Sequence, residues 1–216
     1  MATCCVVGAT GFVGSHVTRE LLMKGYRVRA TCRDPTKAEW LKTLLPDSKI
    51  ELVPLTLKPE GFPVEDSPLD AIVSGCKGVF MCSGYEKQEQ STIDFMVNAG
   101  IAVLRAAIKN NDRTAVVLCS STGSTNPPGA VADALKNELD FWSDPDFQKS
   151  KGKFSPAAKT LMEIEALKFV GRNQKNEVVD EAAAAKAANV RLCIMNPSLI
   201  LGPQLQPGMD SFVRLI

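Results

Sequence analysis

The sequence predicts an α/β domain built on a doubly wound parallel sheet of about six strands. Short runs rich in β-branched and apolar residues alternate with longer segments of helical periodicity along most of the chain. Two of the strand-like runs, residues 4–7 and 115–118, are apolar throughout, as is typical of parallel strands that helices cover on both faces. With 45% hydrophobic and 23% charged residues, a chain of 216 residues can bury a sizeable core.

The elements follow the order expected for this class. The predicted strands are residues 3–7, 27–32, 50–55, 78–82, 115–119 and 190–195, and the predicted helices are residues 12–24, 38–45, 92–109 and 157–170. A charged and then Ala-rich stretch at 172–189 predicts an extra turn and helix, which we interpret as a surface insertion. We expect one domain over residues 1–203 and, after a Pro/Gly-rich exit, the start of a truncated second unit at 204–216.

Charge and cysteine content limit the function classes. Lys plus Arg number 25 against 24 Asp plus Glu, so a net charge of +1 gives no general attraction to nucleic acid or to an anionic membrane. The seven cysteines have no metal-ligand spacing and mostly lie in apolar runs, which favours buried free thiols, no metal site and a reducing compartment. Without a cleavable leader or an apolar stretch approaching about 20 residues, we expect a cytoplasmic protein with no membrane role.

The first strand runs directly into a glycine-rich turn and then a helix. Gly8 permits the tight turn, Gly11 lets the backbone approach a pyrophosphate, and Gly14 lets the helix pack closely on the sheet. The free N–H groups of the first helical turn, with the positive end of the helix dipole, attract phosphate without any lysine. This predicts a dinucleotide-binding Rossmann domain whose cofactor contacts come from Gly8, Thr10, Gly11, Phe12, Val13 and Gly14.

The turn after the second strand is where such a fold examines the ribose 2′ position. Arg33 and Lys37 would bind a 2′-phosphate, and the guanidinium can also lie flat against adenine. Asp34 opposes this interpretation, because an acidic side chain near this place favours NAD. The sequence therefore favours NADP (NADPH), with NAD as the open alternative.

Five stretches together resemble the extended short-chain dehydrogenase/reductases of the NAD-dependent epimerase/dehydratase superfamily, and within them the dihydroflavonol reductase and cinnamoyl-CoA reductase group. The likeness spans nearly the whole chain and is carried by residues 7–14, 25–35, 119–123, 159–163 and 196–203. It implies a three-layer α/β/α sheet ordered 3-2-1-4-5-6, NADPH as hydride donor, and a small-molecule carbonyl or alcohol substrate bound partly by a C-terminal domain. It also places Pro197 and Ser198 beside the cofactor.

The resemblance implies a catalytic Ser, a Tyr, and a Lys four residues after the Tyr. Ser121 and Lys159 match two of these positions, but the Tyr position holds Ser155. A phenol can pass a proton as hydride moves, whereas an aliphatic hydroxyl is too weak an acid to replace it easily. Ser155, directly before Pro156, also suits the first turn of a helix. By its place after the fourth strand, Tyr85 is a candidate substitute acid facing the nicotinamide half.

The sequence departs from the family's pattern at two more places where the resemblance implies contact with the cofactor. Thr56-Leu57 replaces the family's Asp-Leu near adenine, and Met81-Cys82-Ser83 replaces its His-Val-Ala. Three functions therefore remain open: an NADP-dependent oxidoreductase in which Ser121 polarises a carbonyl, a catalytically impaired NADP-binding sensor or assembly subunit, and an NAD-dependent epimerase or dehydratase. The lone His16 supports no catalytic constellation, and the oligomeric state cannot be read from these residues.

Overall fold

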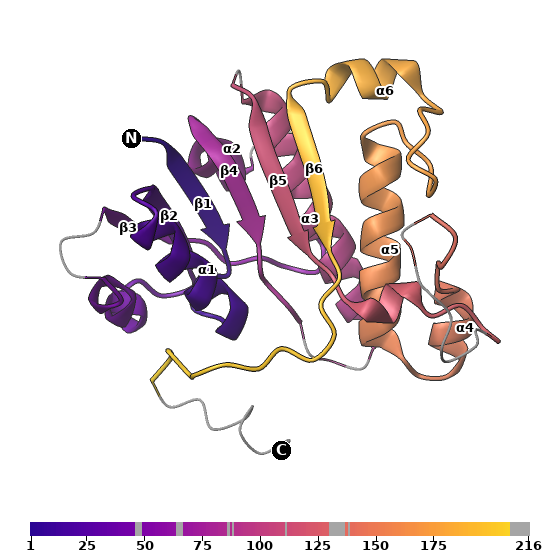
Figure 1. Ribbon diagram of the computed structural model, residues 1–216, viewed down its shortest axis with the longest axis horizontal. Coiled ribbons are helices and arrows are strands. Elements are labelled where there is room, and N and C mark those ends of the chain that lie inside the picture. Colours follow the sequence, from indigo (N-terminus) through magenta and orange to yellow (C-terminus); the bar gives the residue numbers. More distant parts are fainter. Residues whose placement is uncertain are drawn as a thin grey trace.

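Six parallel strands form one twisted sheet at the centre of the molecule (Figure 1). The computed structural model describes residues 1–45, 49–63, 67–85, 87, 89–110, 112–129, 137 and 139–207. The strands are β1 (Thr3–Val7), β2 (Arg27–Cys32), β3 (Ile50–Pro54), β4 (Cys76–Met81), β5 (Thr114–Cys119) and β6 (Val190–Met195). Their order, β3-β2-β1-β4-β5-β6, confirms both the predicted fold class and the 3-2-1-4-5-6 topology.

Helices cover both faces of the sheet. They are α1 (Phe12–Met23), α2 (Pro68–Val73), α3 (Gln90–Lys109), α4 (Pro145–Ser150), α5 (Phe154–Phe169) and α6 (Glu181–Lys186), with 3₁₀ helices η1 (Thr36–Thr43) and η2 (Thr122–Thr125). Alternate residues of β1 enter two separate cores. Cys5 and Val7 pack with α2, α3 and α5, whereas Cys4 and Val6 pack with α1 and η1 on the opposite face.

Three expectations about the helices need correction. The segment expected to be a helix at 38–45 forms a 3₁₀ helix, η1, that begins two residues earlier at Thr36. The short helices α2 and α4 were not predicted, because six residues hold too few turns to show a helical period. Both begin with Pro at the first helical position, and that signal alone marks their starts.

The expected insertion at 172–189 contains one helix, α6, and a turn. Asp180 caps α6 by accepting a hydrogen bond from the backbone N–H of Ala183 at 3.0 Å. A β-bridge between Arg172 and Val178 closes the preceding turn. The segment therefore forms the exposed connection from α5 to β6. Of the proposed second unit at 204–216, residues 208–216 lie outside the described part of the chain.

Helix α3 corrects the expectation that no segment is long and apolar enough to span a membrane. Its 20 residues meet that test by length and composition. Most of the helix is nevertheless buried in the fold, where its apolar face contacts the sheet and α5. Its apolar character is accounted for by its place as the central core helix.

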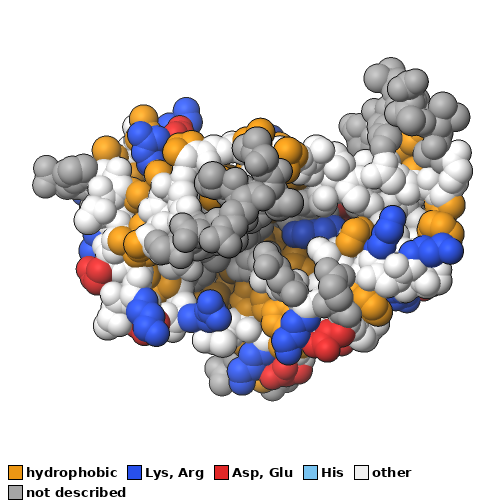
Figure 2. All heavy atoms as spheres, turned by 90° about the horizontal axis from the view of Figure 1, so that it is seen from below, with side chains coloured by type: hydrophobic (Ala, Val, Ile, Leu, Met, Phe, Trp, Pro, Cys, Tyr) orange, Lys and Arg blue, Asp and Glu red, His pale blue; other side chains and the backbone are white. Residues whose placement is uncertain are grey.

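The carboxyl ends of all six strands lie at one edge of the sheet, and Figure 2 looks onto that edge. Strand order reverses between β1 and β4, which both pair with parallel neighbours there. Ligands of doubly wound folds bind in the crevice outside such a reversal. Both basic and apolar side chains reach the surface on this side of the molecule (Figure 2).

Candidate cofactor and active site

The glycine turn between β1 and α1 has the geometry that a bound diphosphate requires. Gly8 has a φ of +85°, in the left-handed region that favours glycine. A methyl group at Gly14 would overlap the backbone carbonyl of Gly8, so only glycine lets α1 approach the turn this closely. Gly8 N–H donates to Thr31 Oγ1 at 3.1 Å and Gly11 N–H donates to Gly8 O at 3.1 Å. These contacts fix the turn in shape.

The N-terminus of α1 faces the crevice without a competing charge. Gly11 is the residue before the helix, no side chain in the described part of the chain caps this end, and the first turn contains no acidic residue. The helix dipole therefore acts on whatever lies beside Thr10 and Gly11. These residues fit the pyrophosphate of a dinucleotide, because an anion meets backbone donors there and the glycines leave room for it.

Two adjoining pockets lie beyond this turn, and Arg33 lines both. The first, of about 350 Å³, contains Gly8, Thr10 and Gly11 together with residues 55–57 after β3 and Phe95 of α3. The second, of about 400 Å³, is lined by Thr10, Cys32, Arg33, Asp34, Lys37 and Trp40. The structure thus brings the predicted residues Arg33 and Lys37 together beside the phosphate turn. We name the second pocket the basic pocket.

Asp34, the residue that favoured NAD, has a local hydrogen-bonding partner. Its Oδ1 accepts hydrogen bonds from the backbone N–H of Thr36 at 2.9 Å and from Thr36 Oγ1 at 2.7 Å. These bonds, the Thr36 hydroxyl first, lower the pKa of the Asp34 carboxyl. A carboxylate engaged in its own turn has less capacity to accept from ribose hydroxyls. This observation weakens the argument for NAD.

Tyr85 lies in the same pocket as the phosphate turn. It lines the 350 Å³ pocket with Gly8 and Arg33, next to residues 82–84 that follow β4. Its ring stacks on Phe95, with centroids 4.9 Å apart and an interplanar angle of 19°. This stacking holds the ring against α3. The role of Tyr85 as a substitute acid stays a prediction.

The opposite side of the crevice is an apolar pocket of about 610 Å³. Phe12 and Val13 line it from α1, Cys82 and Cys119 from the ends of β4 and β5, and Pro197 from the chain after β6. His16 Nε2 lies 2.8 Å from Pro203 O. This contact holds the segment that follows β6 against α1. Ser198 is exposed and is not among the lining residues of this pocket. An uncharged planar ring suits these walls better than a phosphate does.

Ser121 and Lys159 both adjoin the end of β5. Ser121 is the N-cap residue directly before η2, and its Oγ accepts from Gly123 N–H at 3.1 Å. Lys159 Nζ donates to the backbone carbonyl of Cys119 at 2.7 Å, and burial lowers the pKa of the ammonium group. Ser155 is exposed in the first turn of α5, one turn before Lys159 on the same helix face. The expected spacing is present, with an aliphatic hydroxyl where the family has a phenol.

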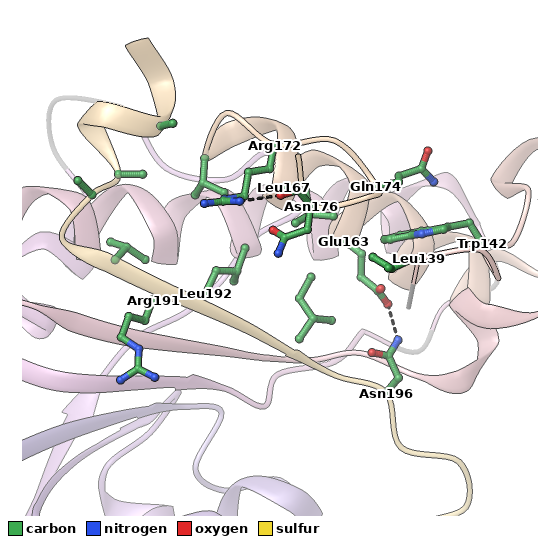
Figure 3. Close-up of a pocket in the computed structure, with 16 residues that line it drawn as sticks. Leu139, Trp142, Glu163, Leu167, Arg172, Gln174, Asn176, Arg191, Leu192 and Asn196 are labelled. Atoms are coloured by element: carbon green, nitrogen blue, oxygen red, sulfur yellow. Dashed lines mark hydrogen bonds between the residues drawn. The ribbon is translucent and has the colours of Figure 1, made fainter. Parts of the chain in front are cut away.

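A buried polar network behind Ser121 was missed by the sequence reasoning. Asn196 Nδ2 donates to Glu163 Oε1 at 2.8 Å, to Ser124 Oγ at 2.7 Å and to the backbone carbonyl of Ser121 at 3.1 Å. Ser120 Oγ donates to the same Glu163 oxygen. Figure 3 shows Glu163 and Asn196 pointing toward one another from α5 and the end of β6. The only sequence signal was a glutamate one turn after Lys159 on a helix with an apolar face.

Figure 3 also shows a fourth pocket, again of about 610 Å³, that runs along β6 between α5 and α6. Trp142 and Arg172 line it, but it contains none of the predicted cofactor-binding or catalytic residues. Among the described residues, no three His, Cys, Asp or Glu side chains come together as a metal site would need.

Comparison with known proteins agrees with the geometry of the crevice. A family model described as NAD(P)H-binding matches residues 8–163, more than half of the chain. The chain belongs to this NAD(P)H-binding family. Among curated relatives, it is 28% identical over 98% of its length to cinnamoyl-CoA reductase CAD2 of Medicago truncatula. It is 34% identical over 95% of its length to the bifunctional dihydroflavonol 4-reductase/flavanone 4-reductase of Pyrus communis.

Solved structures support the fold. Vestitone reductase from alfalfa (Medicago sativa L.) matches with a TM-score of 0.74 at 23% identity, over 99% of this chain and 62% of that chain. Gre2 from Candida albicans, in complex with NADPH, matches with a TM-score of 0.73 at 22% identity, over 94% of this chain and 60% of that chain. The chain spans 62% of the length of the Medicago truncatula relative and 56% of the Pyrus communis relative.

Proposed function

We propose that the chain is the cofactor-binding part of an NADP-dependent oxidoreductase that transfers hydride between NADPH and a carbonyl or alcohol substrate. The basic pocket carries this proposal, because Arg33 and Lys37 line it beside the phosphate turn. A 2′-phosphate distinguishes NADP from NAD, and two cations satisfy it where Asp34 is engaged with Thr36. The curated relatives are named as dihydroflavonol and cinnamoyl-CoA reductases, which supports a small-molecule substrate of that kind.

The cofactor, when bound, supplies hydride from nicotinamide C4. Within the chain, Ser121 stands at the end of β5 and would hydrogen-bond the substrate oxygen. Lys159 would bind the hydroxyls of the nicotinamide ribose, and its ammonium lies within 2.7 Å of the strand end that lines the apolar pocket. Phe12, Val13 and Pro197 would enclose the uncharged ring and exclude water from it.

A second function, a catalytically impaired NADP-binding sensor or assembly subunit, is favoured by one observation. Ser155 occupies the phenol position, and its exposed hydroxyl is a poor proton donor at neutral pH. Cofactor binding would then persist while turnover is slow or absent. The NAD-dependent epimerase or dehydratase rests on Asp34 alone, whose hydrogen bonds to Thr36 do not favour it.

We place the protein in the cytoplasm, a proposal supported by its thiols. All seven cysteines are free, and four of them, Cys4, Cys5, Cys32 and Cys76, are buried. Free thiols persist in a reducing compartment.

Titration of the purified chain with NADPH and NADH, followed by nicotinamide fluorescence, tests cofactor choice. We expect NADPH to bind at least tenfold more tightly, since two cations contact a group that NADH lacks. Equal affinity for the two would overturn the NADP assignment, and affinity for neither would overturn the whole proposal. Oxidation of NADPH with a panel of aldehydes, ketones and acyl-CoA thioesters then separates the two functions, because binding without oxidation identifies the impaired form.

A further inference from the structure

The 3₁₀ helix η1 sorts its side chains into three rows. In a 3₁₀ helix the side chains of residues i and i+3 eclipse, so each row repeats every third residue. Ala38 and Leu41 form one row and are completely buried in the core shared with α1. Glu39 and Lys42 lie in the solvent row and pair at 2.9 Å. The third row contains Lys37 and Trp40, and both line the basic pocket.

The length of η1 is unusual for a 3₁₀ helix. Runs of 3₁₀ helix longer than three or four residues are uncommon because their hydrogen bonds are poorly aligned, yet η1 extends over eight residues. Its regular threefold repeat keeps Trp40 directly above Lys37. The indole is half-buried because part of it packs against the core that includes Leu41 and Leu21, while part faces the pocket. Its place is therefore fixed by packing.

The basic pocket combines two cations and the carboxylate of Asp34, whose Oδ1 accepts from Thr36, with one aromatic wall. Arg33 enters from the end of β2 and Lys37 from the start of η1. Among the described residues that line the pocket, Trp40 is the one aromatic side chain. An apolar wall excludes water from one side of a bound anion, which lowers the local dielectric and strengthens its attraction to nearby cations. The same ring attracts a guanidinium or ammonium group through its π face.

We propose that Trp40 is a specificity-determining residue that selects a ribose 2′-phosphate by forming the dry wall of the basic pocket. The inference rests on the proposed NADP-dependent function and goes beyond it by adding a third, uncharged group to Arg33 and Lys37. On this proposal, nucleotides that lack the 2′-phosphate would bind at the phosphate turn and in the 350 Å³ pocket, which Trp40 does not line. Trp40 would therefore distinguish nucleotides that carry a 2′-phosphate from those that lack one.

The two tryptophans of the chain allow a matched test. Trp142 lines the pocket along β6, which contains no predicted cofactor residue, so the Trp142→Phe variant reports from Trp40 and the Trp40→Phe variant reports from Trp142. Adenosine 2′,5′-bisphosphate is the probe because it carries the 2′-phosphate but no nicotinamide that absorbs indole emission. We expect it to change the fluorescence of Trp142→Phe at saturation and to leave that of Trp40→Phe unchanged. Adenosine 5′-monophosphate should change neither.

Affinity gives the second measurement, by isothermal titration calorimetry. Trp40→Ala should weaken binding of adenosine 2′,5′-bisphosphate by about five- to tenfold, the size of one aromatic contact beside a cation. Binding of the 5′-monophosphate should change less than about twofold, and Trp40→Phe should retain most of the affinity for both.

Each outcome tests either the role of Trp40 or the proposed NADP-dependent function. A Trp142→Phe protein that binds the bisphosphate with no change in Trp40 emission would overturn the role of Trp40 and leave the NADP assignment intact. Equal weakening of both nucleotides in Trp40→Ala and Trp40→Phe would also overturn it. Absence of bisphosphate binding by the unaltered chain would overturn the proposed function itself.

Discussion

Asn196 Nδ2 lies 2.8 Å from Glu163 Oε1 and joins the end of β6 to the middle of α5, directly behind Ser121. The carboxyl group is buried, and burial raises its pKa above the ordinary value of 4.5, although hydrogen bonds from Ser120, Ser124 and Asn196 partly oppose this. The protein therefore binds a proton at Glu163 more tightly when folded than when unfolded.

Glu163→Gln should change how stability depends on pH. Because the folded pKa is raised, the unfolded chain releases its proton first as pH rises, so this group's contribution to stability is present below about 4.5 and is lost as pH passes through the raised value. Glutamine cannot titrate and still accepts hydrogen bonds. We expect the variant to gain stability relative to the parent between pH 4.5 and 8, measured by urea unfolding. A constant difference in unfolding free energy across that range would contradict this assignment.

Gly14→Ala should damage both stability and cofactor binding. The added methyl group meets the carbonyl of Gly8, a backbone atom that cannot move without opening the phosphate turn. We expect a loss of about 1–3 kcal/mol in the free energy of unfolding and weaker NADPH binding. Gly202→Ala is the control, since the nearest atoms to its new methyl group lie 3.8 Å away or farther. That variant should stay within about 0.5 kcal/mol of the parent, and an equal loss in both would show that the overlap is relieved.

Ser155→Tyr tests whether the missing phenol limits turnover. Residues 155 and 159 are one helical turn apart, so a phenol at 155 would share a helix face with the Lys159 ammonium. Since a well-placed proton donor contributes about 10²–10⁴-fold, we expect NADPH oxidation with carbonyl substrates to rise at least tenfold. Ser155→Phe supplies the same ring without its proton. Equal rates in the Tyr and Phe variants would remove the phenol as the explanation.

The thiols should differ in reactivity according to their burial. Burial raises the pKa of Cys82 to about 12, with the neighbouring Cys119 adding to the effect, whereas Cys193 is exposed on β6. At pH 8 Cys82 is therefore almost entirely in the thiol form, and the thiolate is the reactive form. In an Ellman titration of the native chain, Cys193→Ser should remove the fastest phase and Cys82→Ser should preserve it. Loss of that phase in Cys82→Ser would show that the end of β4 is open to solvent.

Local sequence patterns predict much of this fold. Continuous apolar runs predict the buried parallel strands, because helices cover them on both faces, and the glycine spacing predicts the phosphate turn, because backbone sterics require it there. The patterns fail for α2 and α4, which are too short to show a period, and for η1, whose threefold repeat resembles a helical one over eight residues.

The candidate site also contains parts that the local sequence predicts and parts that it does not. Arg33 and Lys37 are close in the chain, so their meeting in one pocket follows from the local turn. The position of the Tyr85 ring depends on Phe95, ten residues farther along, so the local sequence does not predict which pocket it lines. The Glu163 network joins three elements through side chains 33 and 43 residues apart, which no local pattern encodes. The local sequence around Trp40 predicts a helix and indicates no role for the indole.

The close approach of Gly8 to Ser83 joins the two halves of the crevice. Any side chain at Gly8 would strike Ser83, in the segment that follows β4 next to Cys82. The phosphate turn and the strand end that lines the apolar pocket are therefore in direct contact. A residue larger than glycine at position 8 would displace both.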